Sequence, residues 1–377
     1  MRALCIVLDS VGCGHAPDAD DFGDNGANTL GHLFERISDF QLPHLASLGL
    51  YQVLGDRDSQ ISFPENETLP ASRFARLTEL SAGKDTTTGH WELMGAVIDS
   101  PFATFTRFPV ELVAELEEAA GTTFLGNEPA SGTEIIARLG EEHVRTGKPI
   151  LYTSADSVLQ LAAHEDPGIF GNGRLQQLCR DARTILDRRD IRIGRVISRP
   201  FIGARSADFQ RTPNRHDYSL IPPETVLDRL VATGIPTHGV GKISDIFAGS
   251  GIQSSHPTKS NADGMATIDR LWSDGIDGLI FANLVDFDTL YGHRRNPEGY
   301  ARCLQEFDAW LGGFLKKVGP DDLLIITADH GNDPYHSGTD HTREQVPLLT
   351  LNGPEIRDRP TFDEVARILQ STFIDQD

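Results

Sequence analysis

Three short apolar runs, each ending in an aspartate, constrain the fold of this 377-residue chain more than any other feature. They are ALCIVLD near the start, DGLIFANLVDFD at 277–288 and DDLLIITADHG at 321–331. A continuous apolar run of strand length indicates a strand buried on both faces. Between the second and third runs, residues 299–319 have the apolar spacing of a helix and end at a glycine. This order of strand, helix and strand predicts an α/β fold with a doubly wound, mostly parallel sheet.

Residues 100–220 have a different pattern and predict a second, smaller α+β unit. The segments PVELVAELEEAAG and RLQQLCRDARTILDRR have helical spacing, whereas KPILYTSADS and RIGRVISRPFIG are typical of strands. A polar stretch with prolines at 211–223 ends this unit, and the strand pattern then resumes in IPTHGVGK. A chain of this length also exceeds the usual size of a single core. We therefore expect a core domain formed by 1–99 and 221–377, with 100–220 inserted into it.

The charge balance excludes several kinds of partner. Lys and Arg number 34 against 55 Asp and Glu, so the formal net charge is −21. A negative field of this size disfavours binding to nucleic acid and to anionic membranes. If the substrate is an anion, its site must therefore carry local positive charge from metal ions, arginine and lysine.

The cysteines and the apolar runs bear on the compartment. The four cysteines have no CxxC spacing, so neither a disulfide framework nor a zinc knuckle is indicated. The first apolar run is too short for a signal peptide, and no stretch of about 18 apolar residues predicts a membrane span. We expect a cytoplasmic protein. The oligomeric state is open, with a monomer as the expectation.

Acidic and imidazole side chains follow the three apolar runs. Ligands of open α/β sheets collect at the carboxyl ends of the strands, so we expect these distant residues to converge. Carboxylate and imidazole together suit a transition-metal ion such as Mn²⁺ or Zn²⁺. Six candidate ligands are too many for one tetrahedral ion, which indicates two ions. The candidates are Asp9, Asp288, His293, Asp329, His330 and His341.

Each of these ligand assignments has an alternative. Any one acid and imidazole pair, taken alone, is equally consistent with ordinary surface polarity. Asp286 competes with Asp288, and we favour Asp288 as lying nearer the end of its strand. Three further acids, Asp18, Asp20 and Asp21, lack the spacing of a calcium loop with a closing glutamate, so we interpret them as a solvated loop.

A nucleophile is offered by the segment SAGKDTTTGHWELMG at 81–95, where three threonines precede an apparent helix. A hydroxyl at a helix N-terminus faces free N–H groups that favour a bound phosphate. Metal coordination lowers the pKa of such a hydroxyl and activates it. Spacing alone does not choose among Thr86, Thr87 and Thr88, and helix capping is the alternative role for all three.

Together these segments resemble the alkaline phosphatase superfamily and, within it, the bacterial phosphopentomutases. The resemblance covers nearly the whole chain in the family's order: LDSVGCGHAPDADDFGD, GKDTTTGHWELMG, TSADSVLQLAAHE, RTPNRHDYSL, GVGKISDIF, NLVDFDTLYGHRR and TADHGNDP with GTDHTRE. The cofactor-independent phosphoglycerate mutases share the metal ligands but carry a serine motif, G-N-S-x-x-G-H. Aligning that motif with KDTTTGH indicates Thr86 as the nucleophile.

The resemblance implies two Mn²⁺ ions and a phosphothreonine at Thr86 as the active form. One ion would be held by Asp9, Asp329, His330 and Thr86, and the other by Asp288, His293 and His341. Phosphothreonine would donate its phosphoryl group to ribose 1-phosphate, ribose 5-phosphate or their 2-deoxyribose counterparts. The resulting bisphosphate would turn around and return its other phosphoryl group, so a sugar bisphosphate is expected to act as an activator.

The same resemblance implies that the inserted unit is a cap over the substrate. A mutase must exclude water from its phosphoenzyme, because otherwise it becomes a phosphatase. Arginine offers bidentate contacts to phosphate, whereas lysine acts as a point charge. For Asp156 the alternative role is the N-cap of a helix over SVLQLAAHE. The substrate-facing residues implied are Asp156, Arg199, Arg211, Arg215 and Lys242.

Three other functions compete with this one. A phosphatase or phosphodiesterase of the same superfamily would use the same metals with water as the acceptor. A phosphoglycerate mutase is less favoured because threonine replaces the serine motif. A metal-binding structural or regulatory protein without catalysis is disfavoured because every ligand and Thr86 are present.

Overall fold

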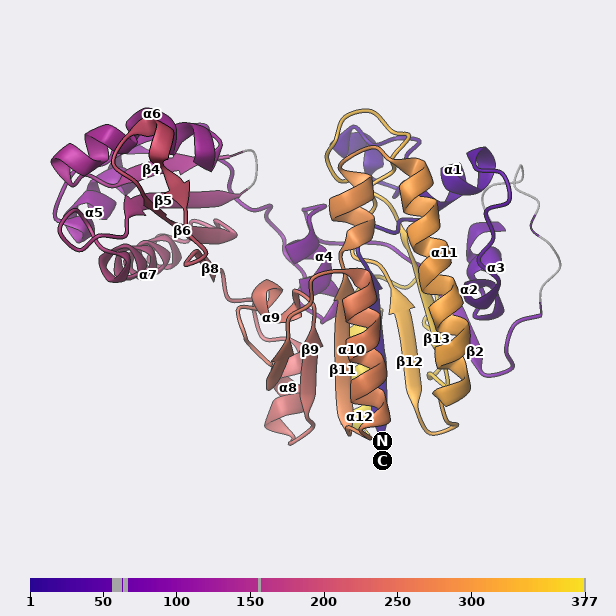
Figure 1. Ribbon diagram of the computed structural model, residues 1–377. Coiled ribbons are helices and arrows are strands. Elements are labelled where there is room, and N and C mark those ends of the chain that lie inside the picture. Colours follow the sequence, from indigo (N-terminus) through magenta and orange to yellow (C-terminus); the bar gives the residue numbers. More distant parts are fainter. Residues whose placement is uncertain (56–62, 64–66, 155–156, 376–377) are drawn as a thin grey trace. The chain divides into compact units, whose positions relative to one another are not determined.

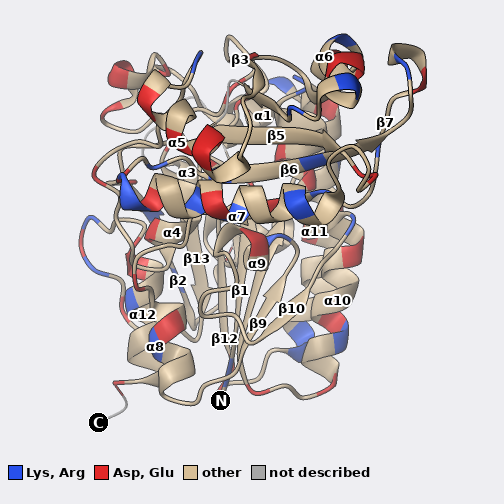
Figure 2. Cartoon of the chain, turned by 90° about the vertical axis from the view of Figure 1, so that its left-hand side faces the viewer, with Lys and Arg blue, Asp and Glu red and all other residues tan. Residues whose placement is uncertain are grey.

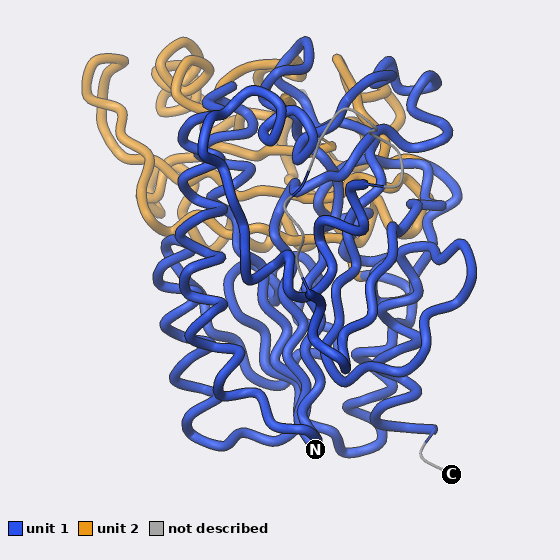
Figure 3. Tube along the Cα trace, turned by 90° about the vertical axis from the view of Figure 1, so that its right-hand side faces the viewer, with its two compact units in different colours: residues 1–100, 222–377 blue, residues 101–221 orange. Residues whose placement is uncertain are grey.

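The computed structural model describes residues 1–55, 63, 67–154 and 157–375 (Figure 1). Contacts within the chain divide it into two compact units (Figure 3). Unit 1 comprises Met1–Ser100 and Pro222–Asp377, and unit 2 comprises Pro101–Ile221. The boundaries expected from the sequence lie one residue before each of these. The role that each unit has in function stays a prediction.

Unit 1 contains, within the described residues, a seven-stranded sheet with the order β10-β9-β11-β1-β12-β13-β2. The strands from β10 to β12 are parallel, whereas β13 runs antiparallel to both of its neighbours, β12 and β2. This confirms the predicted α/β fold with a mostly parallel sheet. The strands are β1 Arg2–Leu8, β2 Ser72–Leu77, β9 Thr237–Val240, β10 Ser254–His256, β11 Gly278–Leu284, β12 Leu323–Thr327 and β13 Val346–Leu351.

The three apolar runs form the three adjacent strands β11, β1 and β12. Strand β1 pairs with β11 over its whole length, from Arg2 opposite Gly278 to Leu8 opposite Leu284, and with β12 on its other side. Every residue of β11 and β12 is buried. Because both faces of these strands are covered, apolar residues fill every position instead of alternating with polar ones.

Helices cover both faces of this sheet, as expected for a doubly wound fold. Helices α10 and α11 lie on one face, and α8 and α12 lie on the other (Figures 1 and 2). The helix predicted over 299–319 forms as α11, which ends at Phe314 and continues as the 3₁₀ turn η4 (Leu315–Lys317). Together with η4, the helices of unit 1 among the described residues are η1 Ala19–Phe22, α1 Thr29–Arg36, α2 Pro43–Ser47, α3 Leu50–Gly55, α4 Thr86–Leu93, α8 Val226–Ala232, α9 Ile243–Ile246, α10 Asn261–Ser273, η3 Phe287–Gly292, α11 Pro297–Phe314 and α12 Glu364–Phe373. No helix among the described residues is long and apolar enough to cross a membrane.

Unit 2 is a second sheet with helices on its two faces and two apolar clusters of its own. The strand order is β3-β4-β5-β6-β7, and β8 pairs with β6. Side chains of α5 and α7 pack on one face around Leu151 and Leu161, and side chains of α6 pack on the other around Tyr152 and Ala162. The elements are α5 Val110–Ala120, β3 Leu125–Pro129, α6 Gly132–Thr146, β4 Ile150–Thr153, β5 Val158–His164, α7 Asn172–Arg188, β6 Arg195–Ile202, η2 Ser206–Asp208, β7 Gln210–Arg211 and β8 His216–Ser219.

The alternative of a helix over SVLQLAAHE was wrong. Val158–His164 forms strand β5, and all seven of its residues are buried between the two apolar clusters. A run that is buried on both faces lacks the alternation that separates a strand from a helix, so its pattern is ambiguous. Asp156, the proposed cap of that helix, lies outside the described residues.

The two ends of unit 2 meet within the unit itself. The amide of Ala103 donates to the carbonyl of Arg192 at 2.9 Å, and the amide of Leu220 donates to the carbonyl of Gly194 at 2.9 Å. The first and last segments of the unit therefore lie against the same short stretch of chain. Neighbouring ends are what allow a whole domain to be inserted into a loop of another.

We predict that residues 101–221 fold on their own when they are expressed as a separate chain. The reason is that this segment contains two apolar clusters and closes its own ends by main-chain hydrogen bonds. Circular dichroism should show one cooperative thermal transition for the fragment. A gradual loss of signal without a transition would contradict the prediction.

Candidate metal centre

Helix α4 directs the hydroxyl of Thr86 toward the carboxyl edge of the sheet. The Asp85 carboxylate caps this helix by accepting from the amides of Thr87 at 3.0 Å and Thr88 at 3.2 Å. It also accepts from the Thr88 hydroxyl at 2.6 Å, so Thr88 is engaged in capping. The Thr86 hydroxyl instead lies 3.1 Å from Nε2 of His330. Of the three candidate threonines, the geometry favours Thr86 as the nucleophile.

A first group of candidate ligands surrounds the His330 imidazole. Its Nε2 lies 3.4 Å from Oδ1 of Asp9 and 3.4 Å from Oδ2 of Asp329. Asp9 directly follows β1, and Asp329 lies two residues after β12, so adjacent parallel strands deliver both acids to one edge. All three side chains are buried.

This group has the properties expected of a site for a cation. Oδ1 of Asp9 and Oδ2 of Asp329 are buried and accept no hydrogen bond among the described residues, although imidazole nitrogens lie near both. A buried carboxylate oxygen without a partner is unfavourable unless a cation faces it. The donor set of carboxylate oxygen, imidazole nitrogen and hydroxyl fits a divalent transition metal. The residues present therefore fit a metal ion.

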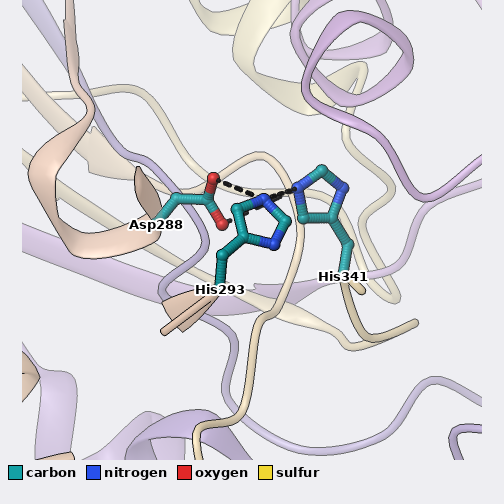
Figure 4. A group of neighbouring side chains, drawn as sticks. All are labelled: Asp288, His293 and His341. Carbon is teal, nitrogen blue, oxygen red and sulfur yellow. Dashed lines mark hydrogen bonds and ion pairs between the residues drawn. The ribbon is translucent and has the colours of Figure 1, made fainter. Parts of the chain in front are cut away.

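A second group consists of Asp288, His293 and His341, whose polar atoms point toward one another (Figure 4). Nε2 of His293 lies 3.1 Å from Oδ2 of Asp288, and Nε2 of His341 lies 3.7 Å from Oδ1 of the same residue. The two Nε2 atoms are themselves 3.1 Å apart. Asp288 and Gly292 belong to the π-helical turn η3, a rare conformation that is frequent at functional sites.

Main-chain carbonyls orient two of the imidazoles as metal ligands. Nδ1–H of His293 donates to the carbonyl of Thr339 at 2.7 Å, and Nδ1–H of His330 donates to the carbonyl of Gly331 at 3.0 Å. With Nδ1 engaged by a carbonyl, Nε2 of each ring faces the neighbouring carboxylates and is the atom that can bind a metal once it has lost its proton. A second hydrogen bond of this kind is the usual way in which proteins fix a metal-binding histidine.

The two groups adjoin each other through Asp288 and the stacked imidazoles. The rings of His330 and His341 stack with centroids 4.0 Å apart. Ligand atoms of Asp9, Asp288 and His330 also lie within 4.8 Å of one another, so Asp288 faces both groups. The structure thus brings all six candidate ligands together at one edge of the sheet.

Asp288 does not lie nearer the end of its strand than Asp286, contrary to the expectation from the sequence. Strand β11 ends at Leu284, so Asp286 is the nearer of the two acids to the strand end. The Asp286 carboxylate accepts from the amide of Asn261 at 2.7 Å and belongs to neither ligand group. Asp288, which lies in the π-helical turn, belongs to both groups of candidate ligands.

Asp18 on the N-terminal loop serves a structural purpose that the sequence did not indicate, whereas Asp20 and Asp21 are exposed, as expected for a solvated loop. Asp18 pairs with the guanidinium of Arg343, which is almost fully buried and also donates to Glu79 Oε2 at 2.6 Å and to the carbonyl of Gly83. Gly83 precedes the cap of α4, so Arg343 ties the loop of His341 to the turn that carries Thr86. Asp20 and Asp21 belong to neither ligand group.

Sequence reasoning also missed residues that hold the ligands in place. Nδ1 of His90 lies 2.8 Å from the carbonyl of Thr86 and 3.0 Å from Oδ2 of Asp329. Asn283 donates to Oδ2 of Asp9 at 3.0 Å, and the amide of Ser10 donates to Oδ1 of Asp329 at 3.1 Å. The histidine after the three threonines was a usable signal for His90. No pattern in the sequence indicated the contacts of Asn283 and Ser10.

The residues expected to face the substrate are divided between the two units. In unit 2, Arg199 lies on β6 between Ser198, which is opposite His216, and Phe201, which is opposite Arg211, so Arg211 and Arg215 lie on strands next to Arg199. Burial lowers the pKa of Arg199, and the charges of Arg215 and Arg211 also lower it. Nε of Arg199 donates to Gln160 at 3.0 Å, and Arg215 pairs with Asp217. In unit 1, Lys242 lies two residues after β9 and belongs to neither ligand group. Asp156 lies outside the described residues.

Comparison with known proteins identifies the class. The model of the metalloenzyme superfamily matches residues 1–371, and the chain belongs to that superfamily. A phosphopentomutase from Symbiobacterium thermophilum is 53% identical over 355 residues, which cover 94% of this chain and 88% of the relative. Within the superfamily the chain is therefore a member of the phosphopentomutase family, which confirms the resemblance found in the sequence.

A solved structure shares the fold at low sequence identity. The PH0037 protein from Pyrococcus horikoshii superimposes with a TM-score of 0.51 at 13% identity, covering 100% of this chain and 98% of that one. At this identity the likeness shows the fold alone.

We predict that Mn²⁺ binding releases protons and weakens as the pH falls. Burial by itself lowers the pKa of His330, but the carboxylates of Asp329 and Asp9 raise it well above its usual value. The hydrogen bond to Asp288 likewise raises the pKa of His293 against the effect of burial. The metal-free site therefore holds protons that a metal must displace. Titration calorimetry in buffers of different ionisation enthalpy measures that release, and a binding heat independent of the buffer would contradict the prediction.

Proposed function

We propose that this chain is a phosphopentomutase that interconverts ribose 1-phosphate and ribose 5-phosphate, and their 2-deoxyribose counterparts. One observation carries the proposal. The Thr86 hydroxyl lies 3.1 Å from Nε2 of His330, inside the ligand group of a chain that is 53% identical to a phosphopentomutase. The reaction would be an isomerisation by phosphoryl transfer, with pentose phosphates as the small-molecule partners.

Two Mn²⁺ ions are the proposed cofactors. Oxygen and nitrogen ligands of this mixture suit Mn²⁺. When bound, such ions act as Lewis acids on phosphoryl oxygens and lower the pKa of a coordinated hydroxyl. The residues that would hold one ion are Asp9, Asp329, His330 and Thr86, and those that would hold the other are Asp288, His293 and His341.

Thr86 would carry the transferred group as a phosphothreonine. The bond between phosphorus and the Thr86 oxygen would break as a new bond forms to the free hydroxyl of a bound sugar monophosphate, and the proton of that hydroxyl would end on the released Thr86 oxygen. The resulting bisphosphate then reorients and returns its other phosphoryl group to Thr86. His90 supports this role because its Nδ1 contacts the Thr86 carbonyl and fixes the residue that must accept and donate the group.

The three clustered arginines of unit 2 are the proposed anchors for the sugar phosphate, together with Asp156 and Lys242. Arg199, Arg211 and Arg215 provide the local positive charge that a chain of net charge −21 needs for an anionic substrate. In this proposal unit 2 is a cap that keeps water away from the phosphothreonine. A sugar bisphosphate would prime the enzyme by phosphorylating Thr86.

The decisive experiment follows the fate of the phosphoryl group. Purified protein, Mn²⁺ and a trace of ribose 1,5-bisphosphate are mixed with ribose 1-phosphate, and both ribose 5-phosphate and free phosphate are measured. We expect ribose 5-phosphate with little free phosphate, and no conversion when a chelator is present. Rapid release of phosphate without the isomer would instead identify a phosphatase. Conversion of 3-phosphoglycerate without any action on ribose phosphates would identify a phosphoglycerate mutase.

We predict that Thr86→Ala abolishes mutase activity, with a loss of roughly 10³-fold or more. Mass spectrometry should then find no phosphorylated threonine after treatment with the bisphosphate. Thr86→Ser keeps a hydroxyl and should retain part of the activity. Thr87→Ala is the matched control, because the side chain of Thr87 makes no contact with the ligand groups among the described interactions. Full activity in Thr86→Ala would refute the proposed nucleophile.

A further inference from the structure

The guanidinium of Arg295 contacts three segments, two of which carry the second group of candidate ligands, while the third contains Asn332 and Asp333. Arg295 lies two residues after His293 and donates both to the turn before His293 and to the loop that ends at His341. The acceptors are the main-chain carbonyls of Gly292 at 3.3 Å, Asp333 at 2.8 Å, Asp340 at 3.2 Å and Gly338, and the side-chain oxygen of Asn332 at 2.7 Å.

We propose that Arg295 is a positioning residue for the second metal ion, fixing Asp288, His293 and His341 relative to one another. The inference rests on the two-ion site of the proposed function. It adds a residue that coordinates no metal itself but whose loss would separate the three ligands. Three sets of contacts support the inference, and each leads from Arg295 to one of the three ligands; we call each set a route.

The routes to the two histidines pass through the main chain. Gly292 precedes His293 and Asp340 precedes His341, and the carbonyls of both accept from Arg295. The His293 imidazole donates to the carbonyl of Thr339, between the two carbonyls that Arg295 holds at Gly338 and Asp340. The stretch 338–340 is therefore fixed from both sides, and it determines where His341 lies relative to His293.

The route to Asp288 passes through the buried side chain of Asn332. The amide oxygen of Asn332 accepts from Arg295 at 2.7 Å, and its amide nitrogen donates to Oδ1 of Asp288 at 2.7 Å. A guanidinium only donates, so it requires the amide oxygen on its own side and directs the amide nitrogen toward Asp288. Gly292 leaves room for this contact, because a Cβ there would lie 2.8 Å from the Asn332 amide nitrogen.

The backbone of Arg295 is consistent with a role that needs its side chain. Its φ is +51°, in the left-handed region that is unfavourable for residues other than glycine. Glycine would adopt this turn with less strain. The turn is held by the amide of Arg295 donating to Gly292 and by the amide of Asn296 donating to Tyr291, both at 3.0 Å. The strained position therefore carries a side chain that makes five contacts.

Lysine cannot replace this arrangement, and the neighbouring arginine offers a matched control. A guanidinium presents five N–H donors in a rigid plane, whereas an ammonium presents three donors from one atom. Lysine at 295 would keep the charge but lose contact with some of the three segments. Arg294 is exposed, and its one described hydrogen bond runs from Nε to the carbonyl of Thr289 at 3.3 Å.

The test is direct measurement of Mn²⁺ binding to the metal-free parent chain, Arg295→Lys and Arg294→Lys. Calorimetry gives the two affinities, and electron paramagnetic resonance detects the coupling between paired Mn²⁺ ions. We expect two ions and coupled spectra for the parent and Arg294→Lys. In Arg295→Lys we expect the first ion to bind as in the parent and the second to bind about 10- to 100-fold more weakly. The Mn²⁺ concentration for half-maximal mutase activity should rise, while kcat recovers at saturating Mn²⁺.

The second variant, Asn332→Ala, breaks only the route to Asp288 and should also weaken the second ion. It decides the question if Arg295→Lys fails to fold, which thermal unfolding of the metal-free proteins reveals. Two ions bound by Arg295→Lys with parental affinities would overturn the role of Arg295. If the parent itself binds fewer than two ions, the two-ion site of the proposed function fails, and the inference fails with it.

Discussion

Buried negative charge is the constraint on which the rest of this structure depends. The carboxylates of Asp9, Asp288 and Asp329 lie within a few ångströms of the same imidazole edge, and burial raises the pKa of Asp9, with Asp329 raising it further. Such a cluster is unfavourable unless cations or protons neutralise it. The residues of the site therefore fit metal ions as the neutralising charge. The same buried carboxylates bear both on the stability of this edge of the sheet and on its chemistry.

The fold meets this constraint by using adjacent parallel strands to collect residues that are far apart in the chain. Strands β11, β1 and β12 run side by side, so Asp288, Asp9 and Asp329 reach one edge although some 280 residues separate the first two. Sheet geometry alone leaves the following loops free to move apart. Two arginines tie them together: Arg343 joins the loop of His341 to the turn before Thr86, and Arg295 joins it to the turn of His293. Fixed ligands and ordered loops are thus parts of one network.

The sequence predicted the parts of this arrangement that have a local signature. Apolar runs ending in acids indicated the central strands, and the recurring acid and histidine pairs indicated the ligand groups. It failed where the outcome depends on tertiary contacts. The β5 strand was ambiguous with a helix because both of its faces are covered, and Asp288 is directed by a π-helical turn that no spacing rule anticipates. Arg295 and Arg343 had no signature. The acceptors of Arg295 are mostly main-chain carbonyls that any sequence provides, and the carboxylates of Asp18 and Glu79 that Arg343 contacts lie far from it in the chain.

The metal centre alone does not decide between transfer to a sugar and transfer to water. In the proposed function, Thr86 would form the same phosphothreonine in a mutase and in a phosphatase, because the first transfer is the same for both. The distinction must come from groups that bind the acceptor and exclude water, and these need positive charge in a chain of net charge −21. Arg199, Arg211 and Arg215 lie on neighbouring strands of unit 2, outside the segments that build the ligand groups. In the proposed function, the core therefore supplies reactivity and the inserted unit supplies the choice of acceptor, which explains why the two are separate units of the fold.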